Sequence, residues 1–114
     1  MKYMLLIYFD ESWDRLSLAA RQQIYEEQMQ LAQQLTASGQ YVAGAPLHPA
    51  STATSVRVRD GKVLLSDGPY VEGAEVANGF YFINTPDRDE AIKIASMIPA
   101  TTVELRRLAG VSGL

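Results

Sequence analysis

The residues that most constrain the fold are 54–66, which read TSVRVRDGKVLLS. Two short β-prone runs flank Asp60-Gly61, a pair suited to the positive backbone φ angles of a two-residue type I′ turn. Such a turn fixes the register of an antiparallel hairpin and sets Arg57 opposite Leu64 on one face. The other face then carries four apolar side chains, which are Val56, Val58, Val63 and Leu65.

A long helix precedes this hairpin in the sequence. Ser17 is a suitable N-cap, apolar residues follow it at helical spacing, and Gly39 suits the left-handed position that ends a helix. Two polar residues, Arg21 and Gln28, interrupt the apolar arc of this helix. The pattern predicts a helix that starts after Ser17 and stops at Ser38-Gly39.

A second helix is expected to open at Thr85-Pro86-Asp87, with proline at its first position, and to end at Pro99. Apolar or alternating runs predict the remaining strands, at 3–9, 40–45, 80–84 and 101–108. The first of these runs lacks polar alternation, so it is expected at the centre of the sheet with both faces covered.

The expected order of elements is β α β β β β α β. It predicts an α+β fold, a ferredoxin-like βαββαβ sandwich with an inserted β-hairpin, in which two helices cover one face of an antiparallel sheet. The 114 residues fit a single domain, 1–114, because no linker or repeat divides them. A sheet covered on one face leaves its other face open, so we expect a homodimer.

Composition excludes several kinds of site. The chain has no cysteine and one histidine, which rules out disulfides, thiolate chemistry and a multi-histidine zinc site within one chain, and no metal or cofactor is expected. A formal net charge of −3 argues against a nucleic-acid partner. No run approaches the length of a membrane span, so a cytoplasmic protein without a membrane partner is expected.

The segment Ser66-Asp67-Gly68-Pro69-Tyr70 follows the hairpin and admits two interpretations. It is a strand-terminating turn, in which the aspartate accepts backbone amides and the glycine supplies a positive φ angle. Alternatively, its exposed glycine amides bind an anion or a substrate carbonyl.

Three further side chains are candidates for chemistry. His48 lies between Leu47 and Pro49, and is either a packed or solvated histidine or a general base. Glu72 and Glu75 follow the turn, and are either solvated charges or ligand contacts, with Glu75 able to orient the histidine.

Four segments of the chain carry a family likeness, and they are MKYMLLIY, SGQYVAGAPL, TSVRVRDGKVLLSDGPY and GFYFINTPDRDEAIKIA. Together they resemble the YCII-related proteins over residues 1–107, and more narrowly the branch named after its Asp-Gly-Pro-Phe (DGPF) motif. The resemblance implies a ferredoxin-like fold of the dimeric α/β-barrel group. It also implies a mostly undefined biochemical role, links to sigma-factor-type regulators, and lyase activity in some wider relatives.

The chain departs from the family pattern at several positions. Tyr70 replaces the phenylalanine of the motif, and Ala74 stands where a lysine is typical. The His–Asp pair that the resemblance implies for the YCII branch falls near Gln28 and Ile98, so this pair is absent.

Two functions remain open at this point. In the first, loops 46–50 and 67–77 form a cleft for a small polar metabolite, lined by Gly68, Pro69, Tyr70, Glu72 and Glu75. There His48 acts as base in proton transfer or elimination, Asp67 or Glu75 orients it, and the Gly68 region stabilises negative charge. In the second, the chain is a non-enzymatic dimeric interaction or regulatory module linked to transcription.

Overall fold

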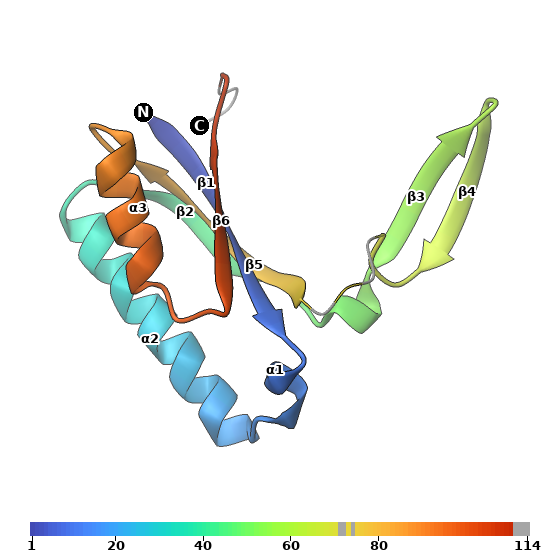
Figure 1. Cartoon of the computed structure of the whole chain (residues 1–114), viewed down its shortest axis with the longest axis horizontal. Coiled ribbons are helices and arrows are strands. Elements are labelled where there is room, and N and C mark those ends of the chain that lie inside the picture. The colour runs from blue at the N-terminus through green and yellow to red at the C-terminus, as the bar shows by residue number, and fades with distance from the viewer. Residues whose placement is uncertain (71–72, 74, 111–114) are drawn as a thin grey trace.

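The computed structural model describes residues 1–70, 73 and 75–110. Figure 1 shows a body of strands and helices from which one hairpin projects. The strands are β1 (Lys2–Asp10), β2 (Tyr41–Pro46), β3 (Thr54–Arg59), β4 (Lys62–Asp67), β5 (Glu75–Asn84) and β6 (Thr102–Arg107). The helices are α1 (Ser12–Arg15), α2 (Leu18–Ala37) and α3 (Arg88–Met97), with a 3₁₀ turn, η1, at Ala50–Thr52.

The body contains a four-stranded sheet in the order β2-β5-β1-β6, and every neighbouring pair is antiparallel. The predicted mixed α+β class with antiparallel sheets is therefore confirmed, and the arrangement is compatible with a ferredoxin-like fold. The strand expected at 3–9 does lie inside the sheet, between β5 and β6.

The hydrophobic core lies on one face of this sheet. Alternate residues of β1, from Tyr3 to Phe9, are buried there, because side chains of a strand point to opposite faces in turn. Side chains from β5, α2 and α3 complete the core, and they are Tyr81, Ile83, Leu31, Leu35, Ala91 and Ile94.

The opposite face of the sheet, which we call the outer face, is only half-buried in the single chain. It carries Met4 and Leu6 of β1 beside Phe82 and Phe80 of β5. The two phenylalanine rings meet edge to face at 5.5 Å. The expectation that β1 is covered on both faces is therefore wrong for one chain alone, because the described residues leave this face partly open.

Local capping chemistry sets the helix ends. The Ser17 hydroxyl accepts a hydrogen bond of 3.1 Å from the amide of Ala20, and Gly39 has φ 75° after the end of α2, as predicted. The predicted opening of the second helix at Thr85-Pro86-Asp87 is wrong, because α3 begins later, at Arg88. Asp87 is its N-cap, with a carboxylate oxygen 2.8 Å from the Glu90 amide, so Pro86 precedes the helix.

Two other boundaries differ from expectation. β5 begins at Glu75 instead of residue 80, and Asn78-Gly79 lies within it, where the pairing with β1 shifts register. The segment 10–17, expected as a loop, contains α1, which begins where the Asp10 carboxylate accepts the Ser12 amide at 2.9 Å. Trp13 of α1 packs on Phe9, with ring centroids 4.6 Å apart.

The hairpin has the predicted register and a separate two-stranded sheet of its own, β3-β4. Asp60 and Gly61 have φ angles of 52° and 73°, as a type I′ turn requires. Val58 pairs with Val63, and Arg57 pairs with Leu64. Nearly all of its residues are exposed, so the hairpin lies outside the core.

Candidate functional site

Two cavities adjoin the loop of residues 47–49. The first, which we call the helix-side cavity, has a volume of about 530 Å³ and lies between α2 and the sheet. The second, the hairpin-side cavity, has about 610 Å³ and reaches the segments at the base of the hairpin. Ile7, from the buried face of β1, lines the first cavity, and Tyr8, from the outer face, lines the second. The loop therefore separates cavities on opposite faces of the sheet.

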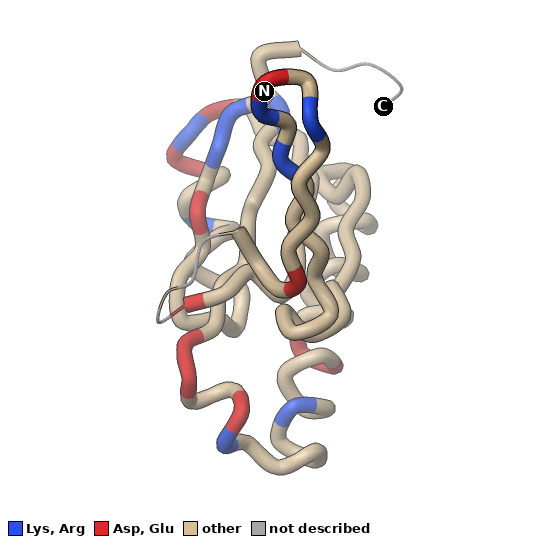
Figure 2. The backbone as a smooth tube through the Cα atoms, turned by 90° about the vertical axis from the view of Figure 1, so that its right-hand side faces the viewer, with Lys and Arg blue, Asp and Glu red and all other residues tan. Residues whose placement is uncertain are grey.

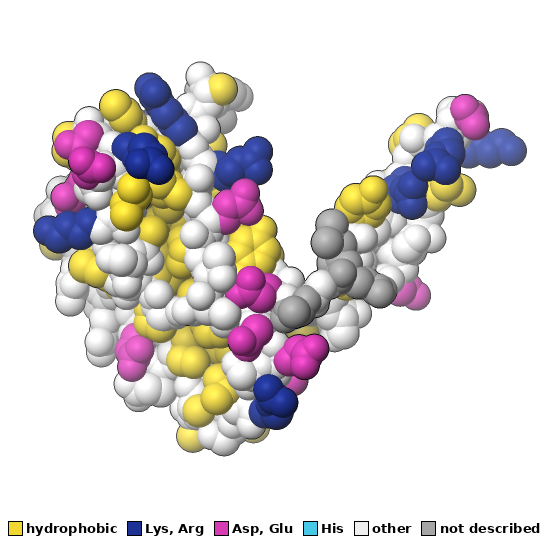
Figure 3. Space-filling model, viewed as in Figure 1, with side chains coloured by type: hydrophobic (Ala, Val, Ile, Leu, Met, Phe, Trp, Pro, Cys, Tyr) yellow, Lys and Arg dark blue, Asp and Glu magenta, His cyan; other side chains and the backbone are white. Residues whose placement is uncertain are grey.

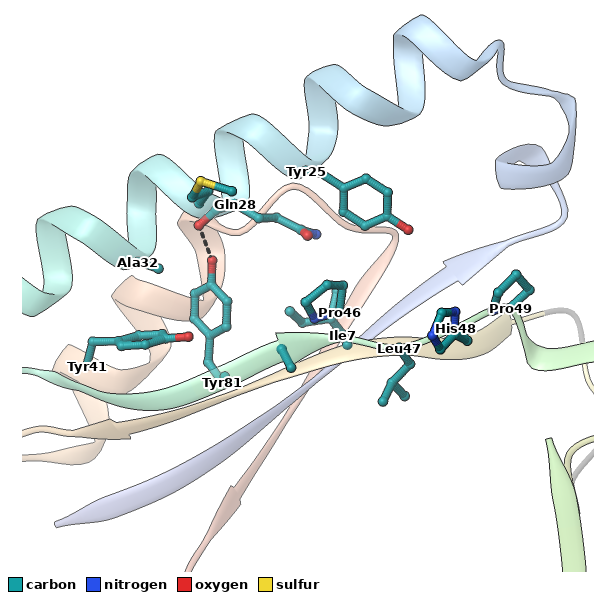
Figure 4. Close-up of a pocket in the computed structure, with 14 residues that line it drawn as sticks. Ile7, Tyr25, Gln28, Ala32, Tyr41, Pro46, Leu47, His48, Pro49 and Tyr81 are labelled. Atoms are coloured by element: carbon teal, nitrogen blue, oxygen red, sulfur yellow. Dashed lines mark hydrogen bonds between the residues drawn. The ribbon is translucent and has the colours of Figure 1, made fainter. Parts of the chain in front are cut away.

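Aromatic side chains give the helix-side cavity its character. Figure 4 shows Tyr25 and Gln28 on α2 facing Tyr41 and Tyr81 on the sheet. The Tyr81 hydroxyl donates a hydrogen bond to the backbone carbonyl of Gln28. The Tyr41 and Tyr81 rings meet edge to face at 5.3 Å. Burial, together with Tyr41, raises the pKa of Tyr81 to about 12, so its phenol stays protonated at neutral pH.

A glycine makes room for this aromatic pair. A Cβ atom at Gly44 would collide with the Tyr41 hydroxyl and would lie 2.7 Å from the Phe80 carbonyl oxygen. The absence of a side chain at this position in β2 therefore allows Tyr41 to lie across the strand, at the wall of the cavity.

Gln28 is a polar group in an otherwise mostly apolar wall. Its side-chain amide donates a hydrogen bond of 3.1 Å to the Pro99 carbonyl, which ties α2 to the segment after α3. Ile98 is buried beside this contact. The two positions that resemble the YCII dyad thus lie in neighbouring segments, but they carry an amide and an alkyl group, which cannot act together as an acid–base pair.

The hairpin-side cavity brings together three of the predicted site residues, His48, Pro69 and Glu75. The Glu75 carboxylate accepts a 2.8 Å hydrogen bond from the Thr102 hydroxyl. Tyr8, on the same wall, donates a hydrogen bond of 3.2 Å to Glu104. Burial of the phenol and the neighbouring Glu104 carboxylate both raise the pKa of Tyr8. The cavity therefore combines a mostly apolar surface with an imidazole, a carboxylate and a phenol.

Two other predicted residues, Asp67 and Gly68, lie at the base of the hairpin. Asp67 pairs with Thr54 at the end of β4. Gly68 has φ 94°, its amide donates to the Ala53 carbonyl at 2.7 Å, and its carbonyl accepts from the Ser55 hydroxyl at 2.8 Å. The Gly68 amide therefore already has an acceptor within the chain. Tyr70 is exposed, with the Arg57 guanidinium 5.5 Å from its ring centroid, and Glu72 lies outside the described residues.

His48 is the residue that the two cavities share, along with Leu47 and Pro49. It is exposed, and its ring has no hydrogen-bond partner among residues 1–70, 73 and 75–110. The amide of Leu47 donates to the Asn78 carbonyl at 2.7 Å, which fixes the start of the loop on β5. Beside it, the Asn78 side-chain nitrogen is buried and has no partner in the described part of the chain.

Sequence reasoning missed the aromatic cavity. The sequence pattern does not single out Tyr25, Tyr41 or Tyr81. Of the two polar residues that interrupt the apolar arc of α2, Gln28 lines this cavity and is the signal that could have indicated it. No cluster of three metal-ligating side chains is present in the described ranges. Nor does any helix that the structure describes have the length and hydrophobicity to cross a bilayer.

Comparison with known proteins gives two matches. The model of the YCII-related domain matches residues 1–108. An uncharacterized protein of Rhizobium meliloti (strain 1021) is 30% identical over 115 residues, which cover 96% of this chain and 93% of the relative.

Proposed function

Because the chain belongs to the YCII-related domain family, and the matched relative is itself uncharacterized, we propose its function from its cavities. The protein binds a small amphipathic molecule in the helix-side cavity, with the imidazole of His48 at the opening. The mostly apolar, aromatic lining favours a ligand with an apolar or aromatic body and one polar group over a wholly polar metabolite.

The proposal rests on one observation: His48 lies between the two cavities and lines both of them. The histidine follows Leu47 and precedes Pro49, whose ring restricts the backbone at this point. Figure 4 shows the imidazole beyond the end of β2, while Leu47 points away from α2. An exposed imidazole at a cavity mouth is free to exchange protons with a ligand and with water.

Catalysis, as we propose it, is a proton transfer or elimination. His48 takes a proton from the carbon next to a carbonyl group, and the electron pair left behind forms a double bond as a leaving group departs with its own pair. Glu75 supports this role as the orienting group, because it shares the hairpin-side cavity with His48. Asp67 and Gly68 line neither cavity, and the Gly68 amide already donates to the Ala53 carbonyl, which favours Glu75 over them.

The binding proposal is tested by thermal shift with 3-phenylpropionate, which joins an aromatic body to a single carboxylate. The probe is expected to raise the melting temperature of the wild type and to do so less for His48→Ala and for Ala32→Leu, which fills part of the helix-side cavity. Leu18→Ala is the control, because Leu18 lies on α2 but is 81% exposed. Equal protection of all four proteins, or of none, would contradict the proposal.

A second candidate, a non-enzymatic homodimeric module of the DGPF branch, is favoured by the exposed hairpin. Asp67-Gly68-Pro69 followed by an aromatic residue supports the branch, and its link to sigma-factor-type regulators suggests a role in transcription. The half-buried outer face supports a dimer, because a second copy would cover its phenylalanine rings. A monomeric mass by light scattering at micromolar concentration would remove this candidate.

A further inference from the structure

We propose that the molecule bound in the helix-side cavity has two polar groups at opposite ends. One lies beside His48, and the other is an uncharged carbonyl group that accepts a hydrogen bond from the phenol of Tyr41. The inference rests on the proposed function and adds to it the length of the ligand and a second recognition group. Three properties of the described residues carry it: a phenol without a partner, its distance from the histidine, and a cavity wall without charged side chains.

The hydroxyl of Tyr41 is free to donate a hydrogen bond to a ligand. Three other phenols of the described residues donate within the chain, and they are those of Tyr3, Tyr8 and Tyr81. The Tyr41 hydroxyl has no partner in the described part of the chain. It is not sealed inside either, because among the described residues that are not exposed only Asn78 has a fully buried side-chain nitrogen or oxygen without a partner. Burial raises the pKa of Tyr41, so the phenol keeps its proton at neutral pH.

The phenol of Tyr41 and the imidazole of His48 lie far apart in the cavity. The ring of Tyr41 runs along β2, so its hydroxyl lies over Gly44, where a Cβ atom would collide with it. His48 follows Gly44 by four residues, which is up to roughly 13 Å at the rise of an extended strand. Figure 4 shows Tyr41 and His48 toward opposite ends of the lining residues. A molecule that contacts both groups is therefore elongated.

The wall between the two ends is apolar. Figure 4 shows Pro46 and Ile7 between them, and both line the cavity. Two small residues, Gly44 of β2 and Ala32 of α2, leave space next to the Tyr41 phenol. The middle of the ligand is therefore an apolar body such as an aromatic ring, which gains free energy when it leaves water for this wall.

The group held by Tyr41 is uncharged. Residues 28–56, which supply most of the cavity wall, include no aspartate, glutamate, lysine or arginine, and neither do the other described residues that line it. Figure 2 shows long tan stretches of the tube between its coloured charged segments, and Figure 3 shows charged side chains scattered over the outside of the molecule. A buried carboxylate or ammonium group without an ion partner is strongly disfavoured, whereas a carbonyl oxygen needs only a donor.

A second phenol, that of Tyr25, belongs to the other end of the cavity. Tyr25 precedes Ala32 by seven residues, which is about two turns or roughly 10 Å along α2. Its ring packs edge to face on Trp13 at 5.5 Å, and Figure 4 shows it displaced from Tyr41 toward His48. Tyr25 is therefore placed to serve the polar group beside His48 and not the carbonyl group at Tyr41.

Isothermal titration calorimetry with two probes of similar size tests the inference. These are 3-(4-acetylphenyl)propionate and 3-(4-isopropylphenyl)propionate, which differ in the carbonyl group. The wild type is expected to bind the acetyl compound about fivefold more tightly, as one net hydrogen bond allows. Tyr41→Phe keeps the ring and is expected to lose this preference. Tyr70→Phe is the control and should keep it, because Tyr70 is 71% exposed and lines neither cavity.

The outcomes separate this inference from the proposed function. Equal affinity of the wild type for the two probes, or an unchanged preference in Tyr41→Phe, would overturn the carbonyl site alone. A wild type that binds neither probe would contradict the proposed function as well. Nuclear Overhauser contacts in the wild type locate the carbonyl group without any substitution. The acetyl methyl protons are expected to contact the ring of Tyr41, and contacts to the ring of His48 instead would overturn the assignment.

Discussion

The hydroxyl of Tyr81 donates a hydrogen bond to the backbone carbonyl of Gln28, and this contact joins β5 to the middle of α2. The phenol is buried, whereas the helix-side cavity opens directly beside it. The wall of the cavity is thus held by a bond between sheet and helix. The first two predictions concern this bond.

Tyr81→Phe removes the donor and keeps the ring. We expect a loss of about 1 kcal/mol in the free energy of unfolding, because the Gln28 carbonyl loses a partner in a partly buried place. Urea denaturation measures the change. Tyr70→Phe is the matched control, because Tyr70 is 71% exposed and should lose almost nothing. Equal losses in the two variants would contradict a structural role for the Tyr81 hydroxyl.

The stability of the fold should fall at alkaline pH through the same residue. The pKa of Tyr81 is raised from 10.0 to about 12, so the folded state holds the phenolic proton more tightly than the unfolded state does. The resulting stabilisation is fully present below pH 10 and is lost as the pH rises toward about 12. Urea midpoints at a series of pH values should therefore fall less steeply above pH 10 in Tyr81→Phe than in the wild type.

Gly44→Ala tests the packing around Tyr41. The added methyl group meets both the Tyr41 hydroxyl and the Phe80 carbonyl, so we expect a loss of about 1–3 kcal/mol in the free energy of unfolding. Adding Tyr41→Phe should recover part of this loss, because it removes the nearer of the two atoms. A Gly44→Ala protein as stable as the wild type would show that the strand accommodates the methyl group.

Asp87→Ala tests the start of α3. Its carboxylate accepts the Glu90 amide, so replacement should cost about 1 kcal/mol of stability. Asp89→Ala is the control, because Asp89 lies in the first turn without capping the helix and contributes only through the helix dipole. If the two variants lose the same stability, the cap does not lie at Asp87.

Local chemistry made much of the fold predictable. The register of the hairpin followed from Asp60-Gly61, and the limits of α2 followed from Ser17 and Gly39, because each of these signals acts within a few residues. The start of β5 could not be predicted from such a local signal. Asn78-Gly79 is typical of a strand boundary, but pairing with β1 carries the strand through it with a shift in register.

The candidate site was less accessible to sequence reasoning than the fold. His48, Pro69 and Glu75 are separated along the chain, and the structure places them on one cavity. Asp67 and Gly68 instead hold the hairpin, because the amide of Gly68 reaches Ala53. The aromatic wall could not be predicted from pattern, since a tyrosine that lines a cavity and a tyrosine that fills a core have the same spacing on a strand.

The central claim is that a small amphipathic molecule binds beside His48, and NMR of this imidazole tests it most directly. His48 is the one histidine of the chain, so its ring signals are unambiguous. We predict that 3-phenylpropionate shifts these signals in a saturable manner, and that Ala32→Leu weakens the effect. Ring signals that stay unchanged while the same probe binds elsewhere on the protein would contradict the claim.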